Sequence, residues 1–173
     1  MTVTPRKPIL QALVNVLAND GAIGSLTLTA PETIYAVPRI AWFDGIGQLE
    51  IQVCSSDGHL ISDMDHDGSI RRYHAFFSIG IFQTLRLDNL NRYNDALLSD
   101  TESIIDIEDM VINAIYKAGP NFLPVTDPNT HVTKELLVRP LIMTSWQEPQ
   151  ALDGKPGVLL SRLNFRGGIN DAL

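Results

Sequence analysis

One run of acidic residues has the residue types and spacing that could bind a metal ion. Asp63, Asp65 and Asp67 alternate with other residues and are followed by Gly68, which matches the opening of a calcium-binding loop. In such a loop the alternating carboxylates converge on the ion, and position 12 is a bidentate glutamate. Here position 12 is His74, and the flanking residues have the pattern of strands. A plain acidic turn is therefore the favoured interpretation, with a calcium-binding β-rich module as the alternative.

Three histidines near this turn raise the question of a transition-metal site. His59, His66 and His74 are separated by seven and eight residues, and these spacings match no compact ligand motif. A His-Asp pair such as His66-Asp67 also occurs in metal phosphohydrolases, but those enzymes need further ligands presented from helices. A hydrolase would use the same turn and would require a metal for turnover of phosphoesters. Its candidate residues are Asp63, Asp65, His66 and Asp67.

Motifs of the common enzyme classes are missing from the sequence. There is no Gly-x-Ser-x-Gly elbow, no phosphate-binding Gly-rich loop and no Cys/His pair with an orienting group. The Gly45-Ile46-Gly47 stretch is too short for a dinucleotide signature and precedes a strand pattern rather than a helix. We therefore expect a protein that is not an enzyme, with no catalytic residue, no cofactor and no metal ligand assigned.

Length and composition indicate one domain spanning residues 1–173. The chain has 173 residues and is 45% hydrophobic, enough for a core that needs neither disulfides nor metals. The single Cys54 excludes an intrachain disulfide and is expected as a small buried thiol in a strand. A net charge of −7 argues against a protein that grips phosphates. Nucleic-acid binding is therefore disfavoured, although an acidic passage could let DNA slide past without sticking.

Neither a membrane span nor a secretory signal is expected. The longest apolar runs, Leu136–Val138 and Leu141–Met143, are far shorter than the roughly 18 to 20 residues that a spanning helix needs. The N-terminal pattern is amphipathic and is interrupted by Gln11 and Asn15. We expect a product made in the cytoplasm.

A long strand is predicted from Ile70 to Thr84, because every second residue from Tyr73 to Ile81 is apolar. We expect burial on that side and partial cover on the other. The apolar side consists of Tyr73, Ala75, Phe77, Ile79 and Ile81. The opposite side consists of Arg72, His74, Phe76, Ser78, Gly80 and Phe82.

Shorter extended segments precede the long strand. Leu49–Val53 alternates apolar and other residues and is predicted as a half-buried strand. Thr33–Ile40 is predicted as extended but interrupted by Pro38, which suits an edge strand or a bulge. Polar turns at Ser55–Gly58 and Asp63–Ser69 separate the later segments. Strands that follow one another through turns are expected to pair antiparallel.

Three helices are predicted from apolar residues at helical spacing. The first two cover Pro8–Ala18 and Asn89–Leu98. The third has an apolar stripe from Ile107 to Ala118 and a stop signal at Gly119-Pro120. Ser103 and Asp106 offer oxygens that can cap its start.

The C-terminal third is predicted as a loop and a hairpin. Pro120–Thr133 contains three prolines among polar residues and is predicted as a loop. Strands at Leu136–Trp146 and Val158–Phe165 follow, joined by a turn that contains Asp153-Gly154 and Pro156-Gly157. The fold class is α+β: a mainly antiparallel sheet with a long central strand, packed against about three helices, with a C-terminal hairpin.

Aromatic and basic residues supply candidates for interfaces. Trp42, Phe43 and Trp146 are either interface anchors or core residues, and the sequence does not separate the two. Arg162 and Arg166 share a strand face with Asn164. They indicate either an exposed sheet edge or a salt-bridged contact between subunits.

With this order of elements, the chain resembles the tail terminator and tail-completion (neck) proteins of tailed bacteriophages. The resemblance is one of layout and covers most of the chain. It lies in the opening helix Pro8–Ala18, the central strand Arg71–Thr84, the helix Ile107–Lys117 and the final strands Leu136–Trp146 and Val158–Phe165. The acidic turn Asp63–Gly68 has no counterpart role in that family.

The resemblance implies a structural virion protein without a catalytic site. Such subunits form a hexameric ring at the head-proximal end of the tail, which ends growth of the tail tube and joins tail to head. The implied partners are other copies of the chain, the tail tube protein, the head–tail connector and, as a further candidate, the tail sheath. Neighbouring subunits would pack sheet edges and loops together, and hairpin tips or the loop Pro120–Thr133 would reach adjacent proteins. DNA would pass through the lumen only as a polyanion.

A head–tail connector or neck adaptor that docks on the portal is the alternative within the same virion. It would share the composition and the lack of catalytic motifs, and it would differ in its docking partner. Both interpretations predict a protein located in the tail or neck of the virion.

Overall fold

Two long neighbouring strands form the centre of the fold. In this computed structural model, β4 (Ile70–Thr84) pairs antiparallel with β8 (Lys155–Ala172) along its whole length, from Ile70 opposite Ala172 to Thr84 opposite Val158. The structure describes residues 6–26, 33–41, 49–55, 63–64, 70–84, 102–119, 124–126, 133–135 and 141–172. The predicted boundaries of the long strand, Ile70 and Thr84, are confirmed.

Four further strands extend the sheet around this pair. The order is β1-β2-β4-β8-β7, and β3 (Asp63–Met64) pairs with β4 outside this path. The other bounds are β1 Ile34–Ala36, β2 Leu49–Ser55 and β7 Ile142–Leu152. All neighbours are antiparallel except β1 and β2, which are parallel. The predicted α+β class with a mainly antiparallel sheet is confirmed, as is the C-terminal hairpin.

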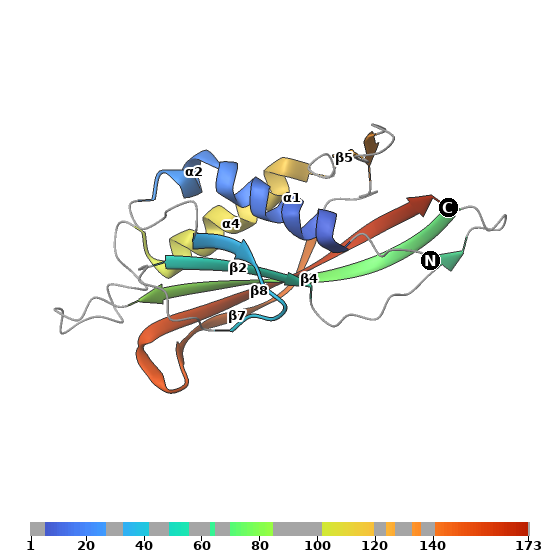
Figure 1. Cartoon of the computed structure of the whole chain (residues 1–173). Helices are drawn as coiled ribbons and strands as arrows, with labels where there is room; N and C mark the ends of the chain where they lie inside the picture. Colours follow the sequence, from blue (N-terminus) through green and yellow to red (C-terminus); the bar gives the residue numbers. More distant parts are fainter. Residues whose placement is uncertain are drawn as a thin grey trace.

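Helices cover one face of this sheet (Figure 1). They are α1 (Arg6–Asn19), the short α2 (Gly21–Gly24) and α4 (Ile104–Ala118). The start of α4 is fixed by a capping box, in which Ser103 Oγ accepts from the Asp106 N–H and Asp106 Oδ2 accepts from the Ser103 N–H. Gly119, with a φ of 60°, ends the helix. The two longer helices, α1 and α4, occur where the sequence predicts helices. The third predicted helix, Asn89–Leu98, lies outside the described residues.

The core lies between the helices and the alternate residues of the central strands. Phe77, Ile79 and Ile81 of β4 are buried there, as the strand period predicts. The β2 and β8 residues in register with them point to the same side. Further buried members of the cluster are Ile51, Val53, Leu163, Phe165, Leu13, Leu17, Ile107, Val111 and Ile115.

A short segment, residues 37–41, covers part of the opposite sheet face. Its start continues the parallel pairing, since Val37 N–H donates to Val53 O at 2.9 Å. Its end crosses the face, since Ala41 N–H donates to Gln52 Oε1 at 3.0 Å and the Ile40 side chain lies against Gly80 of β4. The crossing follows Pro38, where the predicted edge strand β1 has ended.

The prediction that Leu49–Val53 is a half-buried strand is wrong. With residues 37–41 over its second face, β2 is buried on both faces. Glu50 and Gln52 are 3% and 1% exposed on the side that the sequence pattern assigns to solvent. The period of a strand cannot reveal a segment that folds over it from elsewhere in the chain. Cys54 is buried on the same side, as predicted for a small thiol.

The C-terminal hairpin is longer than predicted and its turn is shorter. β7 runs from Ile142 to Leu152 rather than ending at Trp146, and β8 begins at Lys155, so that Pro156 and Gly157 lie in a strand. The turn is Asp153-Gly154, and Gly154 has a φ of 75°, which favours glycine. Residues 136–140 lie outside the described part.

Part of the predicted loop Pro120–Thr133 is also a strand. β5 (Pro124–Thr126) pairs with β6 (Thr133–Glu135) as a separate two-stranded sheet. Pro124 is the first residue of its strand, a position where the missing N–H is tolerated. In the predicted turn Asp63–Ser69, likewise, the first two residues form β3.

Substituting Gly80 tests the cover formed by residues 37–41. A Cβ at this position would overlap the Ile40 Cγ2. We expect Gly80→Ala to lower the free energy of unfolding by about 1–3 kcal/mol through overpacking, and by less in an Ile40→Ala background. Urea denaturation measures both. Gly157→Ala is the matched control, since a Cβ there meets nothing within 4 Å; equal losses at Gly80 and Gly157 would contradict the proposed contact.

Candidate interaction surfaces

The residues of the predicted acidic turn are only partly placed. Asp63 lies on β3 with its backbone opposite Arg72, and His74 lies on β4 opposite Gly168. Three of the remaining candidates lie outside the described residues, namely Asp65, His66 and Asp67, and so does His59. Calcium binding at this turn therefore stays a prediction. Among the described residues, no group of three or more His, Cys, Asp or Glu side chains is placed to hold a metal ion.

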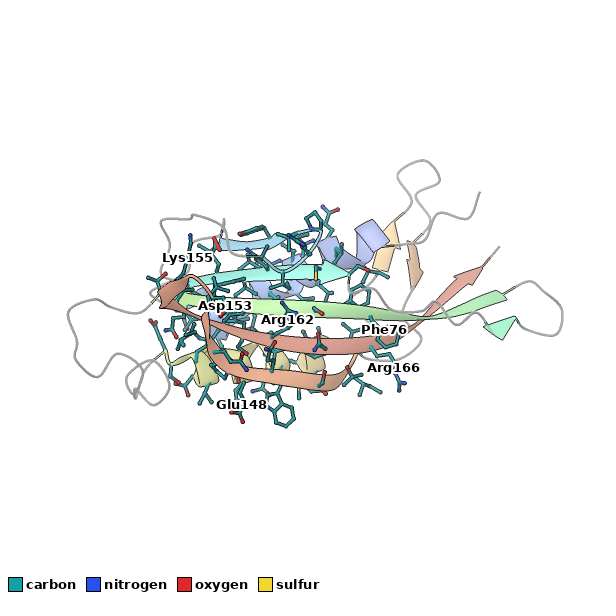
Figure 2. The ribbon with its side chains drawn as sticks, turned by 90° about the horizontal axis from the view of Figure 1, so that it is seen from below. Phe76, Glu148, Asp153, Lys155, Arg162 and Arg166 are labelled. Carbon is teal, nitrogen blue, oxygen red and sulfur yellow. The ribbon has the colours of Figure 1, made fainter. Side chains whose placement is uncertain are left out.

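Beyond the reach of residues 37–41, no other described residue covers the sheet face opposite the helices. We call this area the open face (Figure 2). It belongs to β4, β8 and β7, and its rows follow from the strand register. Its members are Phe76, Arg162, Asn164, Arg166, Ile142, Ser145 and Gln147.

One row of the open face combines apolar and basic side chains. Arg166 is exposed and lies between Phe76 of β4 and Ile142 of β7, its direct partners on either side. Ile142 is 47% exposed. Aromatic residues and arginine are enriched in protein interfaces, so this row has the composition of a contact surface.

The next row is a ladder of polar side chains. Ser78 Oγ donates to Asn164 Oδ1 at 2.6 Å, and Asn164 Nδ2 donates to Ser145 Oγ at 3.0 Å. Thr144 Oγ1 also donates to the carbonyl of Asn164 at 3.2 Å. These bonds fix Asn164 between β4 and β7, so the side-chain amide of Asn164 has hydrogen-bond partners on both neighbouring strands.

Arg162 lies in the following row, beside Gly80 and Gln147. Its Nε is buried and makes no hydrogen bond. Burial raises the pKa of the nearby Cys54 thiol, and the positive charge of Arg162 opposes this rise. The side chain of Arg162 is only partly buried, so its guanidinium group brings positive charge to this row of the open face.

The sequence suggests that Arg162 and Arg166 could lie at an exposed edge, and this interpretation is wrong. β8 lies inside the sheet, between β4 and β7. The two arginines instead point away from the helices on the open face, as Figure 2 shows. The contact between subunits, the other sequence-based interpretation, stays a prediction.

A second surface lies at the side of the molecule, where α4 meets β7. We call it the lateral face and define it by Ile105, Asp109, Ile112 and Tyr116 of α4 with Trp146 and Glu148 of β7. The four α4 residues are spaced by four, three and four residues, which places them along one side of the helix. Tyr116 Oη accepts a hydrogen bond from the Met143 N–H of β7 at 3.2 Å, which joins the two elements.

The lateral face exposes large apolar side chains. Trp146 is 60% exposed, Tyr116 46% and Ile105 40%. The core interpretation of Trp146 is therefore wrong, whereas Trp42 and Phe43 lie outside the described residues. The stripe of Ile105, Ile112 and Tyr116 was missed in the sequence, because the stronger stripe from Ile107 to Ala118 accounts for the same helix.

Carboxylates give the lateral face a negative charge. Asp109 of α4 and Glu148 of β7 are exposed, and the negative charge of each interacts with the buried Glu108 of α4. Burial raises the pKa of Glu108, with the charges of Asp109 and Glu148 adding to the rise and a hydrogen bond from Ser161 opposing it. Glu108 Oε1 is buried without a hydrogen-bond partner.

A second buried carboxylate lies under the cover of residues 37–41. Glu50 Oε1 accepts from the Tyr35 hydroxyl at 3.2 Å, and Gln52 Nε2 donates to the same hydroxyl at 2.9 Å. Burial raises the pKa of Glu50, which these hydrogen-bonding groups oppose. Because this network is enclosed, it belongs to the interior rather than to either surface.

The free edge of β7 is irregular. Its pairing with β8 shifts register between Met143 and Ser145, between Gln147 and Gln150, and again after Ala151. Pro149 lies within the second shift and has no N–H to donate. Bulges and prolines on an edge strand hinder pairing with a strand of another molecule. Contacts at this edge are therefore expected to use side chains.

The chain matches no protein-family model and no curated protein sequence. In the described part of the chain, no helix is long and apolar enough to span a membrane.

The buried carboxylate of Glu108 predicts a pH-dependent stability. Its pKa in the folded state is raised above the ordinary 4.5, so its contribution to stability is full below that value and is lost as the pH rises through the folded pKa. We expect Glu108→Gln to gain stability relative to the wild type between pH 4.5 and pH 8. Urea denaturation at both pH values measures this gain.

Asp153→Asn, which removes an exposed carboxylate in the β7–β8 turn, is the control. A Glu108→Gln difference that stays constant across this pH range would contradict the account of Glu108.

Proposed function

We propose that this protein is a structural subunit of a tailed bacteriophage, which forms a ring at the head-proximal end of the tail, ends growth of the tail tube and joins tail to head. The layout of the elements, which resembles that of tail terminator proteins, motivates the proposal. The observation that carries it is the lateral face, where Trp146 of β7 is 60% exposed and Tyr116 of α4 is 46% exposed. Exposed apolar patches of this kind mark interaction surfaces.

The ring acts by shape and by the number of its contacts. Each subunit contacts two neighbours, so contacts that are weak singly become strong together when the ring closes. One face of the ring binds the last layer of tube subunits, and the other face cannot accept a further layer. Growth of the tube therefore stops where the ring binds.

The acidity of the chain is consistent with this role. A net charge of −7 repels a polyanion, so DNA that passes the ring does not adhere to it. Partners of the ring are the tube subunits on one side and the connector on the other. The location is the neck of the virion.

Tube assembly in the presence of the purified chain tests this function. We expect tube subunits from the same virion to form tubes that stop growing, with rings at one end, when the chain is present. We expect Trp146→Ala to weaken this effect about tenfold or more in the concentration required, because large aromatic anchors dominate interface energies. Electron microscopy measures tube length and occupancy of the tips.

Gln11→Ala, on the exposed side of α1, is the matched control and should act as the wild type. Tubes of unchanged length and bare tips at all concentrations would overturn the proposal. Rings that bind isolated portal instead of tube tips would favour the head–tail connector.

A further inference from the structure

We propose that the lateral face of one copy binds the open face of the next copy, with Glu148 and Asp109 facing Arg162 and Arg166. This inference rests on the proposed function, because it names the contact by which the ring would form. It follows from two surfaces of opposite charge on one chain. Each surface has exposed apolar side chains, and its charged groups have no ion-pair partner among the described residues.

The charges of the two surfaces are complementary. On the lateral face, the exposed carboxylates of Asp109 and Glu148 lie near the buried Glu108, whose pKa is raised mainly by burial and further by these two charges. On the open face, Arg166 is exposed and Arg162 has a buried Nε without an acceptor. No ion pair joins any of these groups to another residue in the described part of the chain. Contact between the two faces would place opposite charges together and lower both self-repulsions.

The apolar side chains are complementary as well. Arg166 lies between Phe76 and Ile142 on the open face. Trp146 and Tyr116 are the exposed aromatic residues of the lateral face. An arginine stacked on an aromatic ring gains from the charge and from apolar contact together. Tryptophan, tyrosine and arginine are the residues that most often dominate interface energies.

Contacts between like surfaces are disfavoured by the same charges. A lateral face against a second lateral face would bring two sets of carboxylates together, and an open face against an open face would bring arginines together. Strand addition at β7 is hindered by Pro149 and by the register shifts. The remaining arrangement uses two different surfaces, and a contact of this type forms a ring when the rotation between neighbouring subunits closes.

Reversal of one charge on each surface tests this contact. We expect Glu148→Arg and Arg166→Glu each to weaken association about tenfold or more, since close like charges are costly in an interface. The double variant Glu148→Arg/Arg166→Glu should regain association, and so should an equimolar mixture of the two single variants, because each contact then pairs opposite charges. Native mass spectrometry over a concentration series measures the fraction assembled.

Asp153→Arg and Arg39→Glu carry the same charge changes at exposed positions outside both surfaces and should assemble as the wild type. Thermal melting confirms that every variant is folded. If the wild type assembles and the single variants assemble equally well, this contact is wrong while the ring remains possible. Loss of assembly without recovery in the double variant also overturns the contact. A wild type that stays monomeric in the presence of tube ends overturns the contact and the proposed function together.

Discussion

Unequal cover of the two faces of one sheet determines the rest of this structure. The pairing of β4 with β8 along the whole of β4 creates a sheet with two large faces. In the described part of the chain, α1, α2 and α4 cover one face. Residues 37–41 cover part of the other, where Ile40 lies against Gly80 and the Ala41 N–H donates to the Gln52 side chain. This cover reaches β2 and β4, and among the described residues none covers the same side of β8 and β7. The uncovered area is where Arg166 and Ile142 are presented, so the fold itself separates an interior half of that face from a half available to other molecules.

Polar side chains form hydrogen-bonded groups on both halves of this face. Under the cover, Tyr35, Glu50 and Gln52 form a connected network. On the open face, Ser78, Asn164 and Ser145 form a ladder. Buried atoms without a hydrogen-bond partner remain at Arg162 Nε and Glu108 Oε1, which belong to residues near the two proposed contact surfaces, and also at Glu50 Oε2 under the cover and at Gln83 Oε1. Such atoms cost free energy until a partner satisfies them. The irregular edge of β7 hinders open-ended strand pairing, which is a property that a subunit of a finite assembly requires.

The sequence predicted those helices and strands that are determined by the pattern of their own residues. The alternation from Tyr73 to Ile81 gave β4, and the residues Ser103 and Asp106 gave the capping box of α4. The errors arose where distant segments decide the outcome. The second buried face of β2 depends on residues 37–41, the interior place of β8 depends on β7 folding back beside it, and the extent of the hairpin depends on the length of β4. The exposure of Trp146 likewise depends on how α4 and β7 pack together, which residue spacing cannot show.

The central claim is that this protein works as one member of a closed assembly, through surfaces rather than through a catalytic site. Sedimentation velocity of the unmodified chain, from sub-micromolar to high micromolar concentration and with tube ends added, tests it most directly. The account predicts a change from monomer to a single larger species of fixed size, with little material of intermediate or larger size. A chain that remains monomeric under all these conditions, or one that grows into ever larger polymers, would contradict it.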